Sequence, residues 1–236
     1  MSEAPIAVVL AGGVGRRLHP YTLTVPKPMM PIGERPILEI LVDRLRAAGL
    51  RRYVFAIGHL GEIIRAHFGD GRAFGVSIHY SAETEPLGTA GPLDLVRTML
   101  DDAFVLVNGD VLADFDWGAI VDGHRRDRAD ATVVVARREE PVDFGVVELD
   151  ERGLVSAWQE KPVVRRLVSA GAYVFEPGSL ALLARNERVD LPDFVMALVR
   201  AGRHVRGHVH PGYWLDIGRP ADYERACADA ARFVDR

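Results

Sequence analysis

Two lysines stand out among the residues that could do chemistry, because all but Lys27 and Lys161 of the 29 basic residues are arginine. Both precede a proline, Lys27 in TVPKPMMPIG and Lys161 in WQEKPVV. Proline fixes its own φ and keeps the residue before it extended, so we expect each ammonium group on a stiff support. Lysine is a compact point charge and arginine a wide planar fork, so the two are not interchangeable in a tight site. This pattern favours Lys27 as a residue that meets phosphate oxygens, and the occurrence of both lysines before a proline, beside predicted strand ends, makes chance a less attractive explanation.

A glycine-rich stretch precedes Lys27, at AGGVGRRL (11–18). Closely spaced glycines let backbone N–H groups approach phosphate oxygens, and an arginine can clamp such oxygens bidentately. The spacing matches neither the G-x-G-x-x-G fingerprint nor a Walker A loop. No Asp or Glu occurs from Ala4 to Gly33, although the chain has 33 acidic residues. The stretch fits either a site for a small polyanion or a strand-ending turn, and the Pro-Lys-Pro segment that follows favours the anion site.

The elements that must position these residues alternate in type along the first half of the chain. Strands are predicted at 6–10, 52–58, 76–81 and 103–110, and helices at 36–49, 60–69 and 89–100. Strands and helices that alternate with short joints predict a mostly parallel sheet with helices on both faces.

From about residue 130 the pattern becomes richer in strands. Strands are predicted at 131–138, within 144–159 around a turn at 150–153, at 167–175 and at 204–209, and helices at 178–186, 191–202 and 220–234. We therefore expect one α/β domain over 1–236, with a Rossmann-like half at 1–129 and a strand-rich half at 130–236.

Ligands of such sheets bind outside the carboxyl ends of the strands. The segments expected to form the site are therefore those that follow strands: 11–18, 81–90, 108–112, 143–145, 159–162, 169–172 and 214–218.

Composition excludes several classes of protein. A net charge of −4 argues against nonspecific nucleic-acid binding, which needs a basic face. No apolar run is long enough to span a bilayer, and no charged-then-apolar leader opens the chain, so we expect a cytoplasmic protein that binds no membrane. Cys227 is the only cysteine, which excludes an internal disulfide and a cysteine-cluster metal site.

The stretch LAGGVGRRLHPYTLTVPKPMMPIGERPILE (10–39) resembles the signature of the nucleotidyltransferases that make nucleotide-sugars from sugar 1-phosphates. Further matches follow in that family's order at 85–93, 107–111, 143–147, 160–162, 169–175 and 214–218. Arg16 is a departure, because the family usually has threonine there. The resemblance implies a Rossmann-like sheet with a strand-rich sugar-binding lobe, and the chain stops too early for the C-terminal β-helix of longer relatives.

The resemblance also implies a reaction and a set of roles. An oxygen of the sugar phosphate would attack the α-phosphorus of a nucleoside triphosphate in line, with pyrophosphate leaving. The half at 1–129 would bind the nucleotide and the half at 130–236 the sugar phosphate, and a homo-oligomer is left open. Nucleotide binding is implied for Leu10, Ala11, Gly12, Gly13, Gly15, Arg16, Glu83, Gly88 and Thr89, with Arg17 and Lys27 as catalytic cations. Sugar-phosphate binding is implied for Asn108, Gly145, Glu160, Lys161 and Gly171, and Mg²⁺ binding for Asp110 and Asp216.

The base and the sugar are read from weaker signals. Guanine presents two adjacent donors that a carboxylate accepts well, whereas uracil and thymine present an edge suited to an amide. Glu83 and Glu85, with no Gln nearby, favour GTP, and EPLGTAGPL (85–93) is similar to mannose 1-phosphate guanylyltransferases. Heptose 1-phosphate guanylyltransferases are also short like this chain. The alternative is an enzyme that uses UTP or dTTP.

Other classes remain open at this point. The D-x-D of DFD (114–116) resembles the metal site of glycosyltransferases that consume nucleotide-sugars, although DFDW reads equally well as the start of a helix. His208 and His210 share a strand face and could bind zinc, but without a third ligand nearby solvated histidines are favoured. A non-catalytic regulatory homologue is supported by Arg16 alone.

Overall fold

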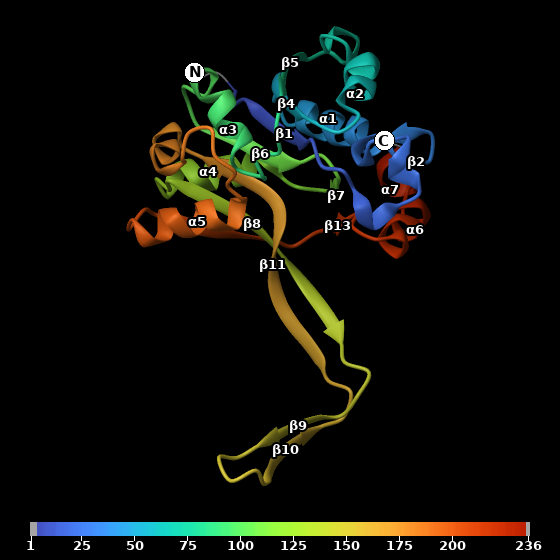
Figure 1. Cartoon of the computed structure of the whole chain (residues 1–236), viewed down its shortest axis with the longest axis vertical. Coiled ribbons are helices and arrows are strands. Elements are labelled where there is room, and N and C mark those ends of the chain that lie inside the picture. The colour runs from blue at the N-terminus through green and yellow to red at the C-terminus, as the bar shows by residue number, and fades with distance from the viewer. Residues whose placement is uncertain (1–3, 235–236) are drawn as a thin grey trace.

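The computed structural model describes residues 4–234, and its centre is a seven-stranded sheet (Figure 1). The strand order is β12-β8-β11-β6-β1-β4-β5. The strands are β1 (Ala7–Ala11), β4 (Arg52–Ile57), β5 (Ser77–Ala82), β6 (Phe104–Asn108), β8 (Ala131–Pro141), β11 (Val163–Phe175) and β12 (Val205–His210). Neighbours pair in parallel except where β11 lies between β6 and β8. The predicted α/β fold with a mostly parallel sheet is therefore confirmed, and both halves of the sequence contribute strands to it.

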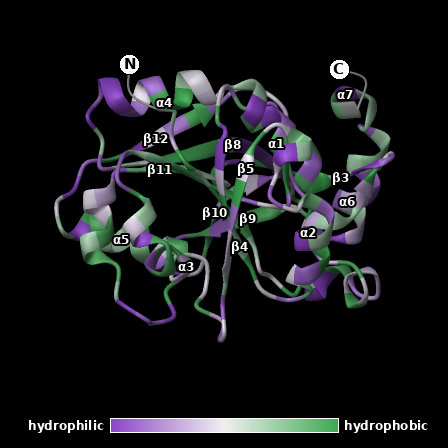
Figure 2. Ribbon diagram, turned by 90° about the horizontal axis from the view of Figure 1, so that it is seen from above, coloured by the Kyte–Doolittle hydropathy of each residue, from purple (hydrophilic) through white to green (hydrophobic). Residues whose placement is uncertain are grey.

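Helices cover both faces of this sheet, which explains why its central strands are apolar runs. The helices α1 (Ile37–Ala47), α2 (Gly61–Phe68) and α4 (Trp117–Arg126) pack on one face, and α3 (Pro92–Leu95) and α5 (Leu191–Arg200) on the other. Figure 2 shows α4 and α5 on opposite sides of β8, β11 and β12. Alternate residues of β1 serve the two cores, with Val9 in the first and Val8 in the second. This period of two is the ordinary side-chain alternation of a strand.

A third apolar cluster ties the end of the chain back to the first half. The helices α6 (Pro220–Ala228) and α7 (Ala231–Val234) pack near the small sheet of β2 (Pro31–Ile32) and β3 (Arg35–Pro36). The Tyr223 hydroxyl donates a hydrogen bond to the Pro31 carbonyl oxygen at 2.7 Å. Beside this cluster, β7 (Val111–Ala113) pairs with β13 (Trp214–Asp216). Among residues 4–234, no helix combines the length and the apolar composition needed to cross a bilayer.

Strands β8 and β11 continue beyond the body as a two-stranded ribbon, and β9 (Val146–Leu149) and β10 (Val155–Gln159) form a hairpin at its end (Figure 1). We call residues 137–167 the arm. The predicted turn at 150–153 is confirmed, because the Gly153 N–H donates to the Asp150 carbonyl oxygen at 3.0 Å. Within residues 4–234 the strands form open sheets and none winds into a β-helix.

Three predicted helices are wrong in extent, and in two cases tertiary hydrogen bonds supply the reason. The helix predicted at 89–100 is only α3 and a 3₁₀ turn, because the N–H groups of Ala90 and Gly91 donate to the Val189 carbonyl oxygen. The helix predicted at 178–186 is a 3₁₀ helix, Pro177–Leu182, where Arg97 donates to the Leu180 and Leu183 carbonyl oxygens. The closing helix, 220–234, is divided into α6 and α7.

The DFD motif begins helix α4. Asp116 is the N-cap, and its Oδ1 accepts the Ala119 N–H at 2.9 Å. Asp114 instead contacts the His210 ring, with Oδ1 2.9 Å from Nε2. Both carboxylates therefore have partners within the fold, which argues against a D-x-D metal site.

We predict that Asp116→Ala lowers the free energy of unfolding by about 1 kcal/mol, because it removes the helix N-cap. Asp122→Ala is the matched control, since Asp122 is an exposed residue of the same helix. Urea titration followed by circular dichroism compares the two. Equal stability of both variants would contradict the capping role.

Candidate active site

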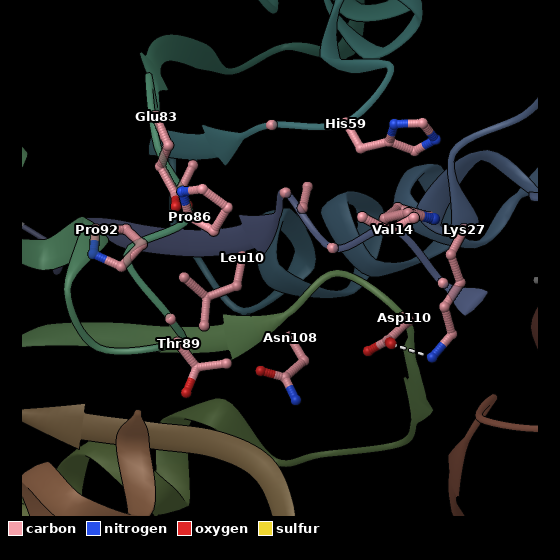
Figure 3. Close-up of a pocket in the computed structure, with 18 of the residues that line it drawn as sticks. Leu10, Val14, Lys27, His59, Glu83, Pro86, Thr89, Pro92, Asn108 and Asp110 are labelled. Atoms are coloured by element: carbon pink, nitrogen blue, oxygen red, sulfur yellow. Dashed lines mark hydrogen bonds and ion pairs between the residues drawn. The ribbon is translucent and has the colours of Figure 1, made fainter. Parts of the chain in front are cut away.

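A cavity of about 680 Å³ opens at the carboxyl ends of β1, β4 and β6 (Figure 3). Its lining includes the glycine-rich loop after β1, the loop 83–92, and Asn108 and Asp110 at the end of β6. The side chains form a row in Figure 3, from Glu83 and Thr89 at one end to Lys27 and Asp110 at the other. The cavity lies where a doubly wound sheet places its ligands.

Buried contacts hold the glycine-rich loop open. Gly15 has a φ of 66°, in the left-handed region that favours glycine. The fully buried Thr22 donates from Oγ1 to the Gly15 carbonyl oxygen at 2.9 Å. A β-carbon at Gly15 would lie 2.9 Å from Thr22 Cγ2, so this approach requires glycine. At the loop's start, the His59 N–H donates to the Gly12 carbonyl oxygen at 3.2 Å. The loop backbone is thus fixed by the body before any ligand binds.

Lys27 is buried, at 8% exposure, in a cluster with two carboxylates. Its Nζ forms an ion pair with Asp110 Oδ2 and lies 3.8 Å from Asp216 Oδ1. The expectation of an extended support holds for Pro26, whereas Lys27 itself begins a 3₁₀ turn, Lys27–Met29. The pairing of Val111 with Asp216 between β7 and β13 brings the two carboxylates together from distant parts of the chain.

The carboxylate pair fits a divalent cation. Burial, and then the negative charge of Asp110, raise the pKa of Asp216 above its ordinary value. Asp110 Oδ1 is buried and has no hydrogen-bond partner among the residues that the structure describes. No cluster of three or more His, Cys, Asp and Glu side chains suited to a metal occurs among residues 4–234. A cation here would take only two carboxylates from the protein, as Mg²⁺ does when phosphates and water supply the remaining ligands.

The opposite end of the cavity is built by the two halves together. Glu83 Oε2 accepts the Leu87 N–H at 2.7 Å, and burial raises the pKa of Glu83. Asp190 Oδ1 accepts the Thr89 N–H at 3.1 Å, and Thr89 Oγ1 accepts the Leu191 N–H at 2.7 Å. These bonds close the loop around a space that Glu83 borders.

The structure brings most of the predicted site residues together. The cavity is lined by Leu10, Ala11, Gly12, Gly13, Gly15, Arg16, Arg17, Lys27, Glu83, Glu85, Gly88, Thr89, Asn108 and Asp110. Asp216 adjoins it through Lys27. A β-carbon at Gly171 would lie 2.7 Å from Asn108 Nδ2, so this glycine packs against the cavity residue.

Three predicted sugar-phosphate residues are elsewhere. Gly145, Glu160 and Lys161 belong to the arm and do not line the cavity. Lys161 also has a φ of 43° and not the extended backbone expected before proline. The arm's paired strands carry these residues away from the body, which sequence spacing could not reveal.

Sequence reasoning also missed several lining residues, among them His59, Arg188 and Asp190. His59 follows β4 and could have been found by applying the strand-end rule to that strand as well. Arg188 and Asp190 follow no strand and carry no local signal. The expectation of solvated histidines is wrong for His210, which is 6% exposed and contacts Asp114.

The sequence matches the model of the family described as nucleotidyl transferase over residues 6–232. A mannose-1-phosphate guanylyltransferase of Mycobacterium tuberculosis is 39% identical, over 97% of this chain and 65% of that protein. A UTP–glucose-1-phosphate uridylyltransferase of Synechocystis is 36% identical, over 93% of this chain and 62% of that protein. The chain spans less than two thirds of the length of each of these relatives.

Solved structures agree with the fold. A Bacillus anthracis protein assigned as a glucose-1-phosphate thymidylyltransferase, solved with sucrose, superposes with a TM-score of 0.79. The two chains are 25% identical, and the match covers 96% of this chain and 95% of the other. HddC from Yersinia pseudotuberculosis, at 24% identity and a TM-score of 0.75, shares the fold over 96% of this chain and 99% of its own.

We predict that Lys27→Met lowers the free energy of unfolding by about 1–3 kcal/mol in EDTA, because two half-buried carboxylates lose their cation. Millimolar Mg²⁺ should restore part of this loss. Urea titrations with and without Mg²⁺ measure both effects.

Lys27→Met with Asp110→Asn is the control for that experiment. Removing one carboxylate should recover stability in EDTA and abolish the Mg²⁺ effect. A Lys27→Met variant as stable as the wild type would refute the charge argument.

Proposed function

Because the chain belongs to the nucleotidyl transferase family, we propose that it transfers a nucleoside monophosphate from a triphosphate to a sugar 1-phosphate. A phosphate oxygen of the sugar forms a bond to the α-phosphorus, and the bond between that phosphorus and the β-phosphate bridging oxygen breaks, which releases pyrophosphate. The observation that carries this proposal is a prebuilt glycine-rich loop facing the cluster of Lys27, Asp110 and Asp216 across one cavity.

In this proposal the protein contributes position and charge. The loop's backbone N–H groups and Arg17 hold the triphosphate, and Lys27 meets the charge that develops around the α-phosphate. Such a reaction needs little covalent work from the protein, since in-line alignment and electrostatic stabilisation supply most of the rate. Arg16 is exposed at the loop, where it adds positive charge beside the phosphates.

The cofactor of this reaction is Mg²⁺, held by Asp110 and Asp216. A bound magnesium ion supplies charge neutralisation and orientation of the phosphates. Two observations support the assignment: the buried Oδ1 of Asp110 has no partner among the described residues, and the pKa of Asp216 is raised. A nearby cation would stabilise both carboxylates in their charged form. Lys27 already supplies part of this positive charge and keeps the pair in place.

GTP is the proposed nucleotide, and a mannose- or heptose-like 1-phosphate is the proposed sugar. Glu83 supports the base, because one oxygen of its carboxylate holds the Leu87 N–H while the group borders the base end of the cavity. The guanylyltransferase relative supports the same choice, and the uridylyltransferase relative supports the alternative of UTP or dTTP. Asn108 and Gly171 would contact the sugar, with Gly145, Glu160 and Lys161 completing its site.

Two other classes receive less support. A glycosyltransferase that uses D-x-D would need the carboxylates that Asp114 and Asp116 commit to His210 and to the helix N-cap. A non-catalytic homologue would not need to keep Lys27, Asp110 and Asp216 together.

Pyrophosphate release tests the reaction directly. With Mg²⁺, five nucleoside triphosphates are crossed with a panel of sugar 1-phosphates that includes mannose and heptose forms. We expect the largest signal with GTP and one of these two sugars. Nucleotide binding without release in any combination would favour the non-catalytic alternative.

We predict that Glu83→Gln lowers kcat/KM for GTP by about 10- to 100-fold, as expected for a lost charge-assisted contact worth 1.5–3 kcal/mol. The amide oxygen can still accept the Leu87 N–H, so the loop is retained. Activity with UTP should change less. Glu85→Gln is the comparison, and a larger effect there would assign the base to Glu85.

A further inference from the structure

The arm is unusually rich in exposed apolar side chains for its length. Nine of the eighteen exposed large apolar side chains among the described residues lie in it. They are Phe144, Val146, Val147, Leu149, Leu154, Val155, Trp158, Val163 and Leu167. A two-stranded hairpin alone in water is marginally stable, and many exposed apolar side chains on one segment favour an interaction site there. The arm therefore calls for a surface to pack against.

The arm's own ladder keeps it from its own cavity. Strands β8 and β11 stay paired from Ala136 with Val168 to Pro141 with Val163, and the Val142 N–H then donates to the Pro162 carbonyl oxygen at 2.9 Å. This ladder places the hairpin about 15–20 Å beyond the body, at roughly 3.3 Å per residue. Figure 1 shows the hairpin separated from the body. The paired ribbon would have to bend sharply for the hairpin to reach its own cavity, so another molecule is the better partner.

The hairpin carries a preformed polar group. Trp158 Nε1 donates to Glu160 Oε2 at 3.3 Å. A β-carbon at Gly145 would lie 2.9 Å from the Trp158 ring and 3.1 Å from Glu160 Oε2, so the three residues pack together. Lys161 follows directly, with its backbone in the left-handed region that costs free energy for any residue but glycine. The Glu160 carboxylate is thus held against Trp158, and Lys161 places an ammonium group directly after it in the chain.

The positive charge of the cavity lining bears on the role of Lys161. Its basic lining residues are Arg16, Arg17, Lys27, His59 and Arg188, and Lys27 is already shared by two carboxylates. The proposed reaction joins a triphosphate to a second phosphate, and a cation from the arm would add to the positive charge that holds the second. Exposed apolar side chains also border the glycine-rich loop, at Val14, Tyr21 and Leu23. Of these three, Val14 lines the cavity itself, so an apolar arm could pack beside the glycine-rich loop.

We propose that two copies of this chain form a dimer in which the arm of each protomer lies over the cavity of its partner. Lys161 and Glu160 of one protomer then complete the sugar-phosphate half of the other's site. This inference rests on the proposed function, because that function supplies the second phosphate. In a closed two-fold dimer, each arm packs on the partner and each cavity receives one arm.

Heterodimers of inactive variants test this arrangement. Two differently tagged chains are co-expressed, and the dimer carrying both tags is purified. A dimer of Lys27→Ala with Lys161→Ala has one complete site if the arm acts on its partner, so we expect about half of the wild-type rate. The wild type paired with the double variant Lys27→Ala, Lys161→Ala should then be inactive, because neither site has both lysines.

The second dimer is the matched control, since it contains the same two substitutions. If the arm served its own cavity, the second dimer would retain half the rate and the first would be inactive. That reversed pattern, or silence in both dimers beside an active wild type, overturns the inference. A wild type inactive with every substrate would instead count against the proposed function.

Sedimentation velocity tests the dimer without activity. The wild type should sediment as a dimer, and Leu149→Ser with Val155→Ser, a cross-strand pair on the arm, should be monomeric with an unchanged circular dichroism spectrum. Met196→Ser with Val199→Ser is the control, because both are exposed apolar residues of α5. A monomeric wild type, or an arm variant that stays dimeric, overturns the inference.

Discussion

The ion cluster of Lys27, Asp110 and Asp216 is the interaction on which the site depends. Three charges from separate segments are taken partly out of water together, and each is tolerable only because the others are present. The parallel pairing of β1 with β6 sets Asp110 beside the glycine-rich loop, and the small β7–β13 sheet adds Asp216. The third apolar cluster, which carries the last helices, anchors that small sheet. Much of the topology near the cavity therefore serves to hold three charges in place.

At the end of the cavity near Glu83, the two halves of the chain contribute different parts. Here the first half supplies the loop and the second half supplies the residues that restrain it, through Asp190 and the backbone of Val189. Leu87 is held from both sides, since its N–H donates to Glu83 and its carbonyl oxygen accepts the Val189 N–H. The cavity is therefore not confined to residues 1–129, although most of its lining comes from there.

The sequence pattern predicted the structure correctly where interactions between residues near one another in the chain determine it. The apolar run before Gly12 predicts a buried strand, and the rule that ligands meet the ends of parallel strands then places the glycine-rich loop, Asn108 and Asp110 at one edge. It failed at 89–100, where the first residues donate hydrogen bonds to the distant Val189 carbonyl oxygen and only the short helix α3 and a 3₁₀ turn follow. It could not place Lys161 in space, because the direction taken by a paired ribbon depends on the whole sheet. Arg188 and Asp190 gave no signal, since only the folded chain brings them near the loop.

Strand β11 is a single strand that joins the arm to the part of the sheet beside the cavity residue Asn108. It begins two residues after Lys161 and passes Gly171, whose close approach to Asn108 depends on its register. An inserted or deleted residue within 163–168 would turn every following side chain to the opposite face. An extra residue in the turn at 150–153 would leave the pairing of β8 with β11 unchanged. The tip of the arm can therefore change in length at a lower structural cost than its root.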